Sequence, residues 1–446
     1  MSALNLTHLI AEYIHQTDYT KFPEDVIEKA KLCLLDWIGV TLAGAREPIS
    51  EITSNLVLGF GGHGQATILG KGWKTNPLFA SLINGTNAHA LDFDDGVLEG
   101  PGHPSAPTIP AILSLAEWKG SSGRDFITAF ATAVQVFFSI DAATMPSHSG
   151  NGWHSTGTIG HLAAAAGSAK LLGLPIPQII HALGISVTQA AGLKNAFGTM
   201  CKPFHAGKAA MDGLLAALLA ERNFTSPVDA ISGKGGFLQV YSSRSTPEAL
   251  REALDGRSFL DEVRFKRYPS CFNTHAAIDC VLSLQDRYAI NPEEIMEIEC
   301  TVYPRCLEVS AIPEPQTGLE AKFSIQYCLA MALQEGKVMI NSFDDSKVKG
   351  PSLNDLMKKV KLVSEESYSK TRTSKVIIRF KNGKTIQERI NLLEVFSDRK
   401  REKADAVQKF KDIAYPFMHK ERADQIIESV DSLDKMNNLS SLIDLV

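Results

Sequence analysis

Several signatures of common protein classes are missing from this sequence of 446 residues. Its seven cysteines are scattered and odd in number, and no Cys-x-x-Cys pair occurs, so neither a disulfide framework nor a zinc knuckle is favoured. The net charge is −5 and the chain has no basic block, which argues against nucleic acid as a partner and favours a small-molecule ligand.

Signals for membranes, secretion and several enzyme classes are also missing. No continuous apolar run approaches the roughly 18 residues that cross a bilayer, so we expect no membrane partner. The N-terminal segment lacks the basic region and cleavage pattern of a signal peptide, and we therefore expect a cytoplasmic location. The glycines between Gly64 and Gly72 have the wrong spacing for a P-loop, and neither H-E-x-x-H nor G-x-S-x-G occurs. Nucleotide binding and serine hydrolysis therefore lose support.

What the sequence does contain is a long helical pattern interrupted by a short α+β segment. Apolar residues recur at three- and four-residue spacing up to about residue 260, and again after residue 398. Residues 294–303 alternate with period two, and residues 374–390 form a hairpin pattern around an Asn-Gly turn. We predict a mainly α protein, with a large all-α domain from residues 1–261 and 396–446 and a smaller inserted α+β lid domain from residues 262–395.

The first cluster of titratable side chains lies between residues 89 and 107. A helix starting near residue 77 would place His89, Asp92 and Asp95 on one face, and the glycine-rich loop from 96 to 102 would then deliver His103. Because Pro104 follows, His103 should lie outside any helix. This cluster fits a proton-transfer site, a site for a divalent metal ion held by His89, Asp92 and Asp95, or simply a solvated helix end.

Two further clusters lie at the starts of apolar helices. His154 precedes a helix rich in small residues, where free N–H groups favour an anion and the histidine could transfer a proton. The alternative is a helix cap made by Ser155 or Thr156. Lys202 precedes Pro203, so we expect an extended conformation at the start of a helix, either clamping a carboxylate or lying at the surface with a buried stem.

The fourth cluster lies at the predicted domain junction, where ligand clefts are common. It contains Lys266, Cys271 and His275, followed later by a segment with Lys322 and Tyr327. No base is adjacent to Cys271 in the sequence, so a nucleophilic role for its thiol is disfavoured.

These pieces, taken in order, resemble the MmgE/PrpD family. The matching motifs are Asn-Gly-Thr-Asn-Ala-His-Ala-Leu-Asp-Phe-Asp-Asp (84–95), Gly-His-Pro-Ser-Ala-Pro (102–107), the His154 loop, Lys-Pro-Phe-His-Ala-Gly (202–207), Tyr-Pro-Ser-Cys-x-x-Thr-His (268–275) and Ala-Lys-Phe-Ser-x-x-Tyr (321–327). The resemblance implies a homodimer, a large helical domain and an α+β lid. It also implies that Asp92, His103, His154, Lys202, Lys266 and Tyr327 line the site.

Two positions depart from that family pattern. Gly96 stands where a threonine usually follows the Asp-Asp pair, and Pro-Ser-Ala-Pro after His103 differs from the Pro-Ser-Asp-Asn type of the methylcitrate dehydratases. The second departure disfavours the dehydratase reaction. The resemblance therefore points to the members similar to cis-aconitate decarboxylase, ahead of 2-methylcitrate dehydratase and iminodisuccinate epimerase.

These observations lead to a functional expectation. All three reactions form or quench negative charge on a carbon next to a carboxylate, so they need cations to hold carboxylates and a group that transfers a proton. We expect a lyase for a small di- or tricarboxylic acid that needs no metal or organic cofactor. Asp92, His103, His154 and Lys202 would be catalytic, and Lys266, Cys271, His275 and Tyr327 would bind the substrate. A metal-dependent helical enzyme and a non-catalytic binding protein are the alternatives.

Overall fold

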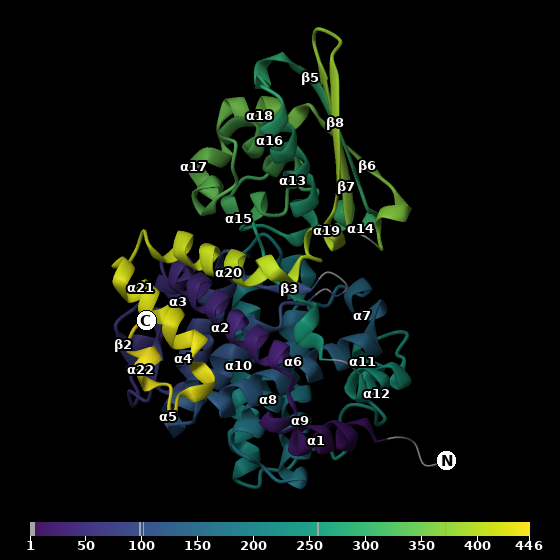
Figure 1. Ribbon diagram of the computed structural model, residues 1–446. Coiled ribbons are helices and arrows are strands. Elements are labelled where there is room, and N and C mark those ends of the chain that lie inside the picture. Colours follow the sequence, from purple (N-terminus) through teal and green to yellow (C-terminus); the bar gives the residue numbers. More distant parts are fainter. Residues whose placement is uncertain (1–4, 98–99, 101, 257, 371) are drawn as a thin grey trace.

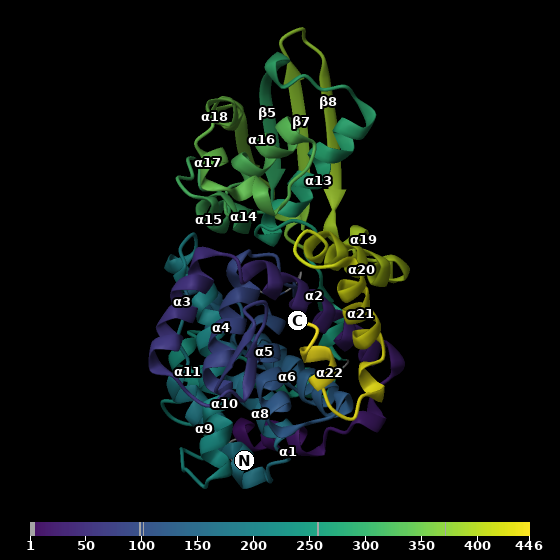
Figure 2. The same ribbon diagram turned by 90° about the vertical axis from the view of Figure 1, so that its left-hand side faces the viewer.

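The computed structural model describes residues 5–446 except 98, 99, 101, 257 and 371. It is mainly helical with small sheets, which confirms the prediction of a mainly α protein (Figure 1). Buried apolar side chains form two large clusters. The first draws on residues 6–265 and 406–443, and the second on residues 268–386. Figures 1 and 2 show the sheet-bearing part standing above the helical part, with the C-terminal helices returning to the lower one.

The helical part is built from helices of different lengths, and the longer ones pack around the first apolar cluster. Before residue 260 they are α1 (Leu6–Gln16), α2 (Glu24–Gly44), α3 (Pro48–Phe60), α4 (Pro77–Ala90), α5 (Ser105–Lys119), α6 (Gly123–Thr144), α7 (Ser147–Gly150), α8 (Ser155–Leu171), α9 (Ile176–Gln189), α10 (Cys201–Glu221), α11 (Phe237–Tyr241) and α12 (Pro247–Asp255). The returning helices are α20 (Arg399–Ala414), α21 (Lys420–Asp431) and α22 (Ser440–Ile443). Two strand pairs, β1 (Ala66–Ile68) with β2 (Trp73–Thr75) and β3 (Gly96–Val97) with β4 (Val263–Arg264), complete this part.

Small residues let the central helices approach closely. A Cβ atom on Gly85 of α4 would lie 2.8 Å from the Cα of Gly207 on α10, and one on Gly207 would lie 2.1 Å from the carbonyl oxygen of Leu82. Both glycines are therefore needed where α4 and α10 cross. This crossing holds the end of α4 and the start of α10 together, and both ends carry candidate site residues.

One helix bears on the expectation that the protein has no membrane partner. Among the described residues, α6 is long and apolar enough by composition to cross a membrane, although its apolar residues are not continuous. Within its most apolar stretch, 94% of the residues are buried inside the protein. The hydropathy of α6 is therefore accounted for by packing against its neighbours, notably α8 and α12.

The sheet-bearing part contains a four-stranded sheet in the order β6-β5-β7-β8. Its strands are β5 (Ile295–Val302), β6 (Val360–Ser364), β7 (Thr373–Phe380) and β8 (Thr385–Asn391), with β5 and β6 parallel and the other pairs antiparallel. The predicted strand and hairpin are confirmed. The helices of this part are α13 (Phe272–Arg287), α14 (Pro304–Val309), α15 (Gly318–Ala321), α16 (Ile325–Glu335), α17 (Asp345–Val348), α18 (Pro351–Lys358) and α19 (Leu392–Val395).

Two local expectations were wrong. Helix α4 ends at Ala90, so His89, Asp92 and Asp95 do not share a helical face. Asp92 instead adopts a left-handed conformation with φ of 51°, which turns the chain directly after the helix. Lys202 lies inside the first turn of α10 rather than in extended chain, because Pro203 is tolerated where backbone N–H groups need no partner within the helix.

Candidate active site

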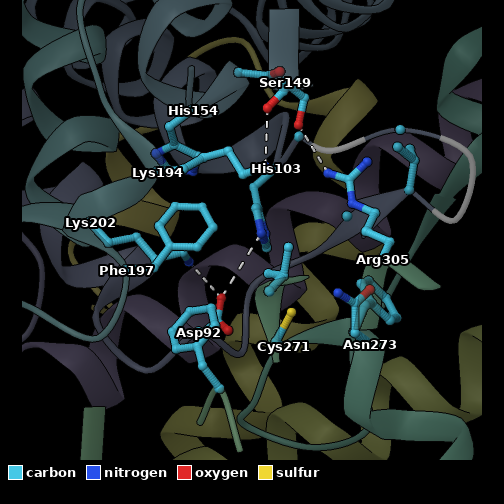
Figure 3. A pocket seen from close by; sticks show the side chains of 18 of the residues that line it. Asp92, His103, Ser149, His154, Lys194, Phe197, Lys202, Cys271, Asn273 and Arg305 are labelled. Atoms are coloured by element: carbon cyan, nitrogen blue, oxygen red, sulfur yellow. Dashed lines mark hydrogen bonds and ion pairs between the residues drawn. The ribbon is translucent and has the colours of Figure 1, made fainter. Parts of the chain in front are cut away.

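Five of the predicted site residues line one pocket between the two parts of the molecule. They are Asp92, His103, His154, Lys202 and Cys271. Figure 3 shows His103 near the centre, with Asp92, Lys202 and Cys271 on one side and Ser149, Lys194 and Arg305 on the other. The loop that carries His103 includes residues 98, 99 and 101, which lie outside the described residues.

Asp92 is a buried carboxylate held by two ammonium groups. Its Oδ1 accepts hydrogen bonds from the Nζ of Lys202 at 2.7 Å and from the Nζ of Lys266 at 2.9 Å. Lys266 also donates to the Asp92 carbonyl oxygen at 2.7 Å. Burial alone would raise the pKa of Asp92, but the two lysines outweigh it and hold this pKa well below its usual range. Asp92 is therefore ionised throughout the physiological pH range.

Lys202 connects Asp92 to a neutral histidine. Its Nζ also lies 2.9 Å from the Nε2 of His89, whose Nδ1 lies 2.9 Å from an oxygen of Asp94. Burial, with Lys202 adding to it, lowers the pKa of His89 to about 3, so the ring is neutral near pH 7. Because an ammonium group can only donate, Nε2 accepts and Nδ1 carries the proton that is donated to Asp94.

His103 is oriented by backbone and by Asp94. Its Nδ1 lies 2.7 Å from the carbonyl oxygen of Asp95 and 3.1 Å from Oδ2 of Asp94. A carbonyl oxygen only accepts, so Nδ1 carries a proton and Nε2 is left to face the pocket. The carboxylate that fixes this ring is thus Asp94. Asp92 lies on the other side of the ring, where its Oδ1 is 3.9 Å from the His103 Nε2.

His154 presents a free nitrogen to the pocket. It occupies the N-cap position of α8 without capping the helix through its side chain. Its Nδ1 lies 3.1 Å from Nδ1 of His205, and its buried Nε2 has no hydrogen-bond partner among the described residues. Burial lowers the pKa of His154 well below its usual value, and the nearby Lys202 acts in the same direction. With its Nδ1 proton donated to His205, a neutral His154 ring can accept a proton or hydrogen bond from a ligand at Nε2, and in the other tautomer the same nitrogen donates.

The remaining predicted residues lie behind the pocket rather than on its surface. Lys266 contacts Asp92 as described above, and His275 is buried with its Nε2 3.3 Å from the Ser270 carbonyl oxygen. Tyr327 lies in the second apolar cluster, where its hydroxyl donates to the carbonyl oxygen of Ser342 at 2.5 Å. Its polar end is therefore already satisfied, which corrects the expectation that Tyr327 lines the site.

Gly96, which departs from the family pattern, also lines the pocket. A Cβ atom at this position would lie 3.0 Å from a ring carbon of Phe272. The threonine that usually occupies this position would therefore require Phe272 to move.

The predicted set of metal ligands is not assembled. Asp95 turns away and accepts a hydrogen bond from the Ser105 hydroxyl. Instead, ligand atoms of His89, Asp92, Asp94 and His103 lie within 4.8 Å of one another. The Lys202 ammonium already contacts two of these four side chains and, with Lys266, would repel a divalent cation there. The four side chains therefore fit ammonium groups better than a metal ion.

Several cations in the pocket were not predicted from the sequence. Lys194, Arg305 and Arg372 line it together with the aromatic rings of Phe197 and Phe323. Arg305 and Arg372 belong to the sheet-bearing part, where nothing in their local sequence distinguishes them from ordinary surface arginines. Only the chain folding places them opposite Lys194.

Comparison with known proteins places this sequence in a family. Residues 8–250 match the MmgE/PrpD N-terminal domain and residues 268–435 match the MmgE/PrpD C-terminal domain. The protein named cis-aconitate decarboxylase from Aspergillus terreus is 30% identical, with 95% of this chain and 92% of that protein covered. The mouse protein of the same name is 27% identical over 100% of this chain and 94% of its own length.

A relative with another reaction is more distant. The mitochondrial 2-methylcitrate dehydratase of Yarrowia lipolytica is 23% identical, covering 81% of this chain and 72% of that protein. Both named reactions are lyase reactions. With the two family regions together spanning nearly all of the sequence, this chain belongs to the MmgE/PrpD family of lyases.

Proposed function

We propose that this protein removes CO₂ from a small unsaturated di- or tricarboxylic acid, as the cis-aconitate decarboxylases among its relatives do by name. The observation that carries the proposal is the buried, unpartnered Nε2 of His154 in a pocket that also holds several cations. Such a pocket favours an anionic ligand that supplies the missing hydrogen-bond partner.

The proposed mechanism needs only side chains of this chain. Cations hold the substrate carboxylates while the bond to the departing CO₂ breaks, and its electron pair delocalises into a remaining unsaturated carboxylate as a dienolate. A proton is then added to carbon from the Nε2 of His103 in its doubly protonated form, whose second proton, on Nδ1, is held by Asp94 and the Asp95 carbonyl, so the ring is left neutral and must take up a proton before the next turnover. Neutral His154 would position the substrate and exchange a proton with it.

Dehydration of a 2-methylcitrate-like acid and epimerisation of an amino-dicarboxylate such as iminodisuccinate are the alternative reactions. Each requires removal of a proton from carbon next to a carboxylate, and the same two histidines could accept it. Incubation with cis-aconitate, 2-methylcitrate and iminodisuccinate in D₂O separates the three. We expect CO₂ release and deuterium incorporation with cis-aconitate. Loss of water, or deuterium exchange without loss of CO₂, would instead identify one of the alternatives.

We further propose that the reaction needs no metal or organic cofactor, because the lysines at Asp92 already provide positive charge where a metal would. Purified protein should keep its activity after treatment with EDTA and dialysis. Loss of activity that returns with a divalent ion would support the metal-dependent alternative instead. Absence of turnover and of ligand binding with all three acids would support another substrate or a binding protein.

The remaining expectations concern the whole molecule. We propose that the part from residue 262 to residue 395 is an inserted lid over the pocket, that the protein works as a homodimer, and that it is cytoplasmic. The homodimer is supported by an exposed apolar stripe on α3 formed by Ile52, Leu56 and Phe60, which are spaced four residues apart.

A further inference from the structure

The end of the pocket away from Asp92 is lined by three cations whose hydrogen bonds within the described part of the chain go to neutral groups. Lys194 donates to the carbonyl oxygen of Ser149 at 3.0 Å, and Arg305 donates to the Ser149 hydroxyl at 3.2 Å. Arg372 donates to the hydroxyl of Tyr303 at 2.7 Å. All three side chains are partly buried. None of these three contacts neutralises charge, in contrast to Lys202 and Lys266, which both contact Asp92.

The first two of these cations are close enough to affect each other. They share Ser149 as hydrogen-bond partner, and Figure 3 shows them on either side of this residue. Burial lowers the pKa of Lys194, and Arg305 contributes in the same direction, while Glu308 acts against it more weakly. Partly buried like charges that make no hydrogen bond to a carboxylate among the described residues are unfavourable unless an anion binds between them.

We propose that Lys194, Arg305 and Arg372 form an outer carboxylate-binding site, which holds the distal carboxylate of a substrate whose reacting end lies at Lys202, His103 and His154. The outer site belongs to the same pocket as the proposed reaction, and in that respect it rests on the proposed function. It narrows the substrate to acids that carry a further carboxylate, away from the reacting carbon. Arginine suits this role because its guanidinium binds carboxylate oxygens in pairs.

The outer site also joins the two parts of the molecule. Lys194 comes from the helical part, whereas Arg305 on α14 and Arg372 before β7 come from the sheet-bearing part. A carboxylate held by all three would bridge these parts. Binding of the correct acid would therefore favour the arrangement in which the pocket is covered.

Calorimetric binding of two inert acids tests the proposal without any turnover. Propane-1,2,3-tricarboxylate and methylsuccinate differ by one terminal carboxylate. The unaltered protein should bind the tricarboxylate about tenfold or more tightly than methylsuccinate, since hydrogen bonds to charged groups are involved. Arg305→Met and Lys194→Met should each reduce this preference to about threefold or less. Arg251→Met, which removes an exposed arginine on α12, should leave the preference unchanged.

Circular dichroism and thermal unfolding check that each variant is folded. Because two variants are made independently, the proposal can still be tested if one of them does not fold. An unchanged preference in a folded Arg305→Met or Lys194→Met protein would overturn the outer site, as would equal or absent binding of the two acids by the unaltered protein. If the preference behaves as expected but no acid is turned over, the outer site stands and the proposed reaction fails. If cis-aconitate is turned over but the variants keep the preference, the proposed reaction stands and the outer site fails.

Discussion

Individual side chains in this pocket differ in whether their polar atoms are already satisfied. Asp92 accepts hydrogen bonds from two lysines and stays ionised. His89 lies between Lys202 and Asp94, and its ring is neutral. By contrast, the Nε2 of His154 and the Oδ2 of Asp92 are buried and have no hydrogen-bond partner among the described residues. A ligand gains most free energy by contacting such atoms, because leaving them unpaired costs about 1–3 kcal/mol each.

Replacement of His154 by alanine should reduce kcat by about 100-fold or more, because the pocket would lose a positioned proton-transfer group. The measurement is CO₂ release from cis-aconitate under saturating conditions, with circular dichroism to verify folding. His63→Ala provides the control, since His63 is exposed. If the folded His154 variant keeps most of its activity, the role assigned to this residue is wrong.

Asp95 makes a pH-dependent contribution to stability. Burial raises the pKa of this carboxyl from 3.8 to about 7, although Ser105 acts against the shift. Between those values the folded state binds more protons than the unfolded state, so this contribution to the free energy of unfolding decreases as pH rises from about 4 to about 7. Asp95→Asn removes the titration.

The stability of Asp95→Asn relative to the unaltered protein should therefore improve by at least about 1 kcal/mol between pH 5 and pH 8. Urea unfolding at the two pH values measures this difference. Ser258→Ala, at a position outside the pocket, should show a constant difference from the unaltered protein. A constant difference for Asp95→Asn would mean that Asp95 is ionised at both pH values.

At the scale of elements, the crossing of α4 and α10 brings together Asp92, which follows the end of α4, and Lys202, which lies in the first turn of α10. Gly207→Ala would place a Cβ atom within 2.1 Å of the Leu82 carbonyl oxygen and force the helices apart. We expect a loss of about 1–3 kcal/mol in the free energy of unfolding, with weaker activity as Lys202 shifts. Denaturant unfolding and kcat/KM together measure both effects.

Gly59→Ala is the matched control, because a Cβ atom there meets nothing within 4 Å in a helix, α3. It should stabilise the protein by up to about 1 kcal/mol, since alanine is the better helix former. If both substitutions had the same effect, close contact at Gly207 would not limit the packing of α4 on α10.

The sequence predicted helices and strands better than the positions where they end. Periodicity was sufficient for the apolar α8 and for the hairpin of β7 and β8 because those patterns depend on many residues. The end of α4 depends on one left-handed residue, Asp92, and could not be predicted from spacing. Arg305 was missed because its role depends on long-range folding, and Tyr327 was misplaced because the partner of its hydroxyl was unknown.

At the scale of the whole molecule, the exposed stripe on α3 predicts an interface between two copies. The side chains of Ile52, Leu56 and Phe60 are 59%, 60% and 66% exposed, and Phe60 also stacks on Phe79. Leu56→Asp would bury a charge in this interface and should shift the protein from dimer to monomer. Size-exclusion chromatography with light scattering measures the mass.

Asn55→Asp adds the same charge to a neighbouring exposed position of α3 and should leave the dimer intact. A dimer that persists in Leu56→Asp would place the interface elsewhere on the molecule. A monomeric unaltered protein would contradict the proposed homodimer altogether.

Lys266 has a particular place in the chain, because it lies between Phe265, in the first apolar cluster, and Tyr268, in the second. The ammonium group that helps to keep Asp92 ionised therefore belongs to the segment that connects the two apolar clusters, and Lys322 of the second part similarly donates to the Leu91 carbonyl beside Asp92. Any swing of the upper part would pull both cations away together. The charges that keep Asp92 ionised would then be in place only while the upper part covers the pocket and keeps water away from the substrate.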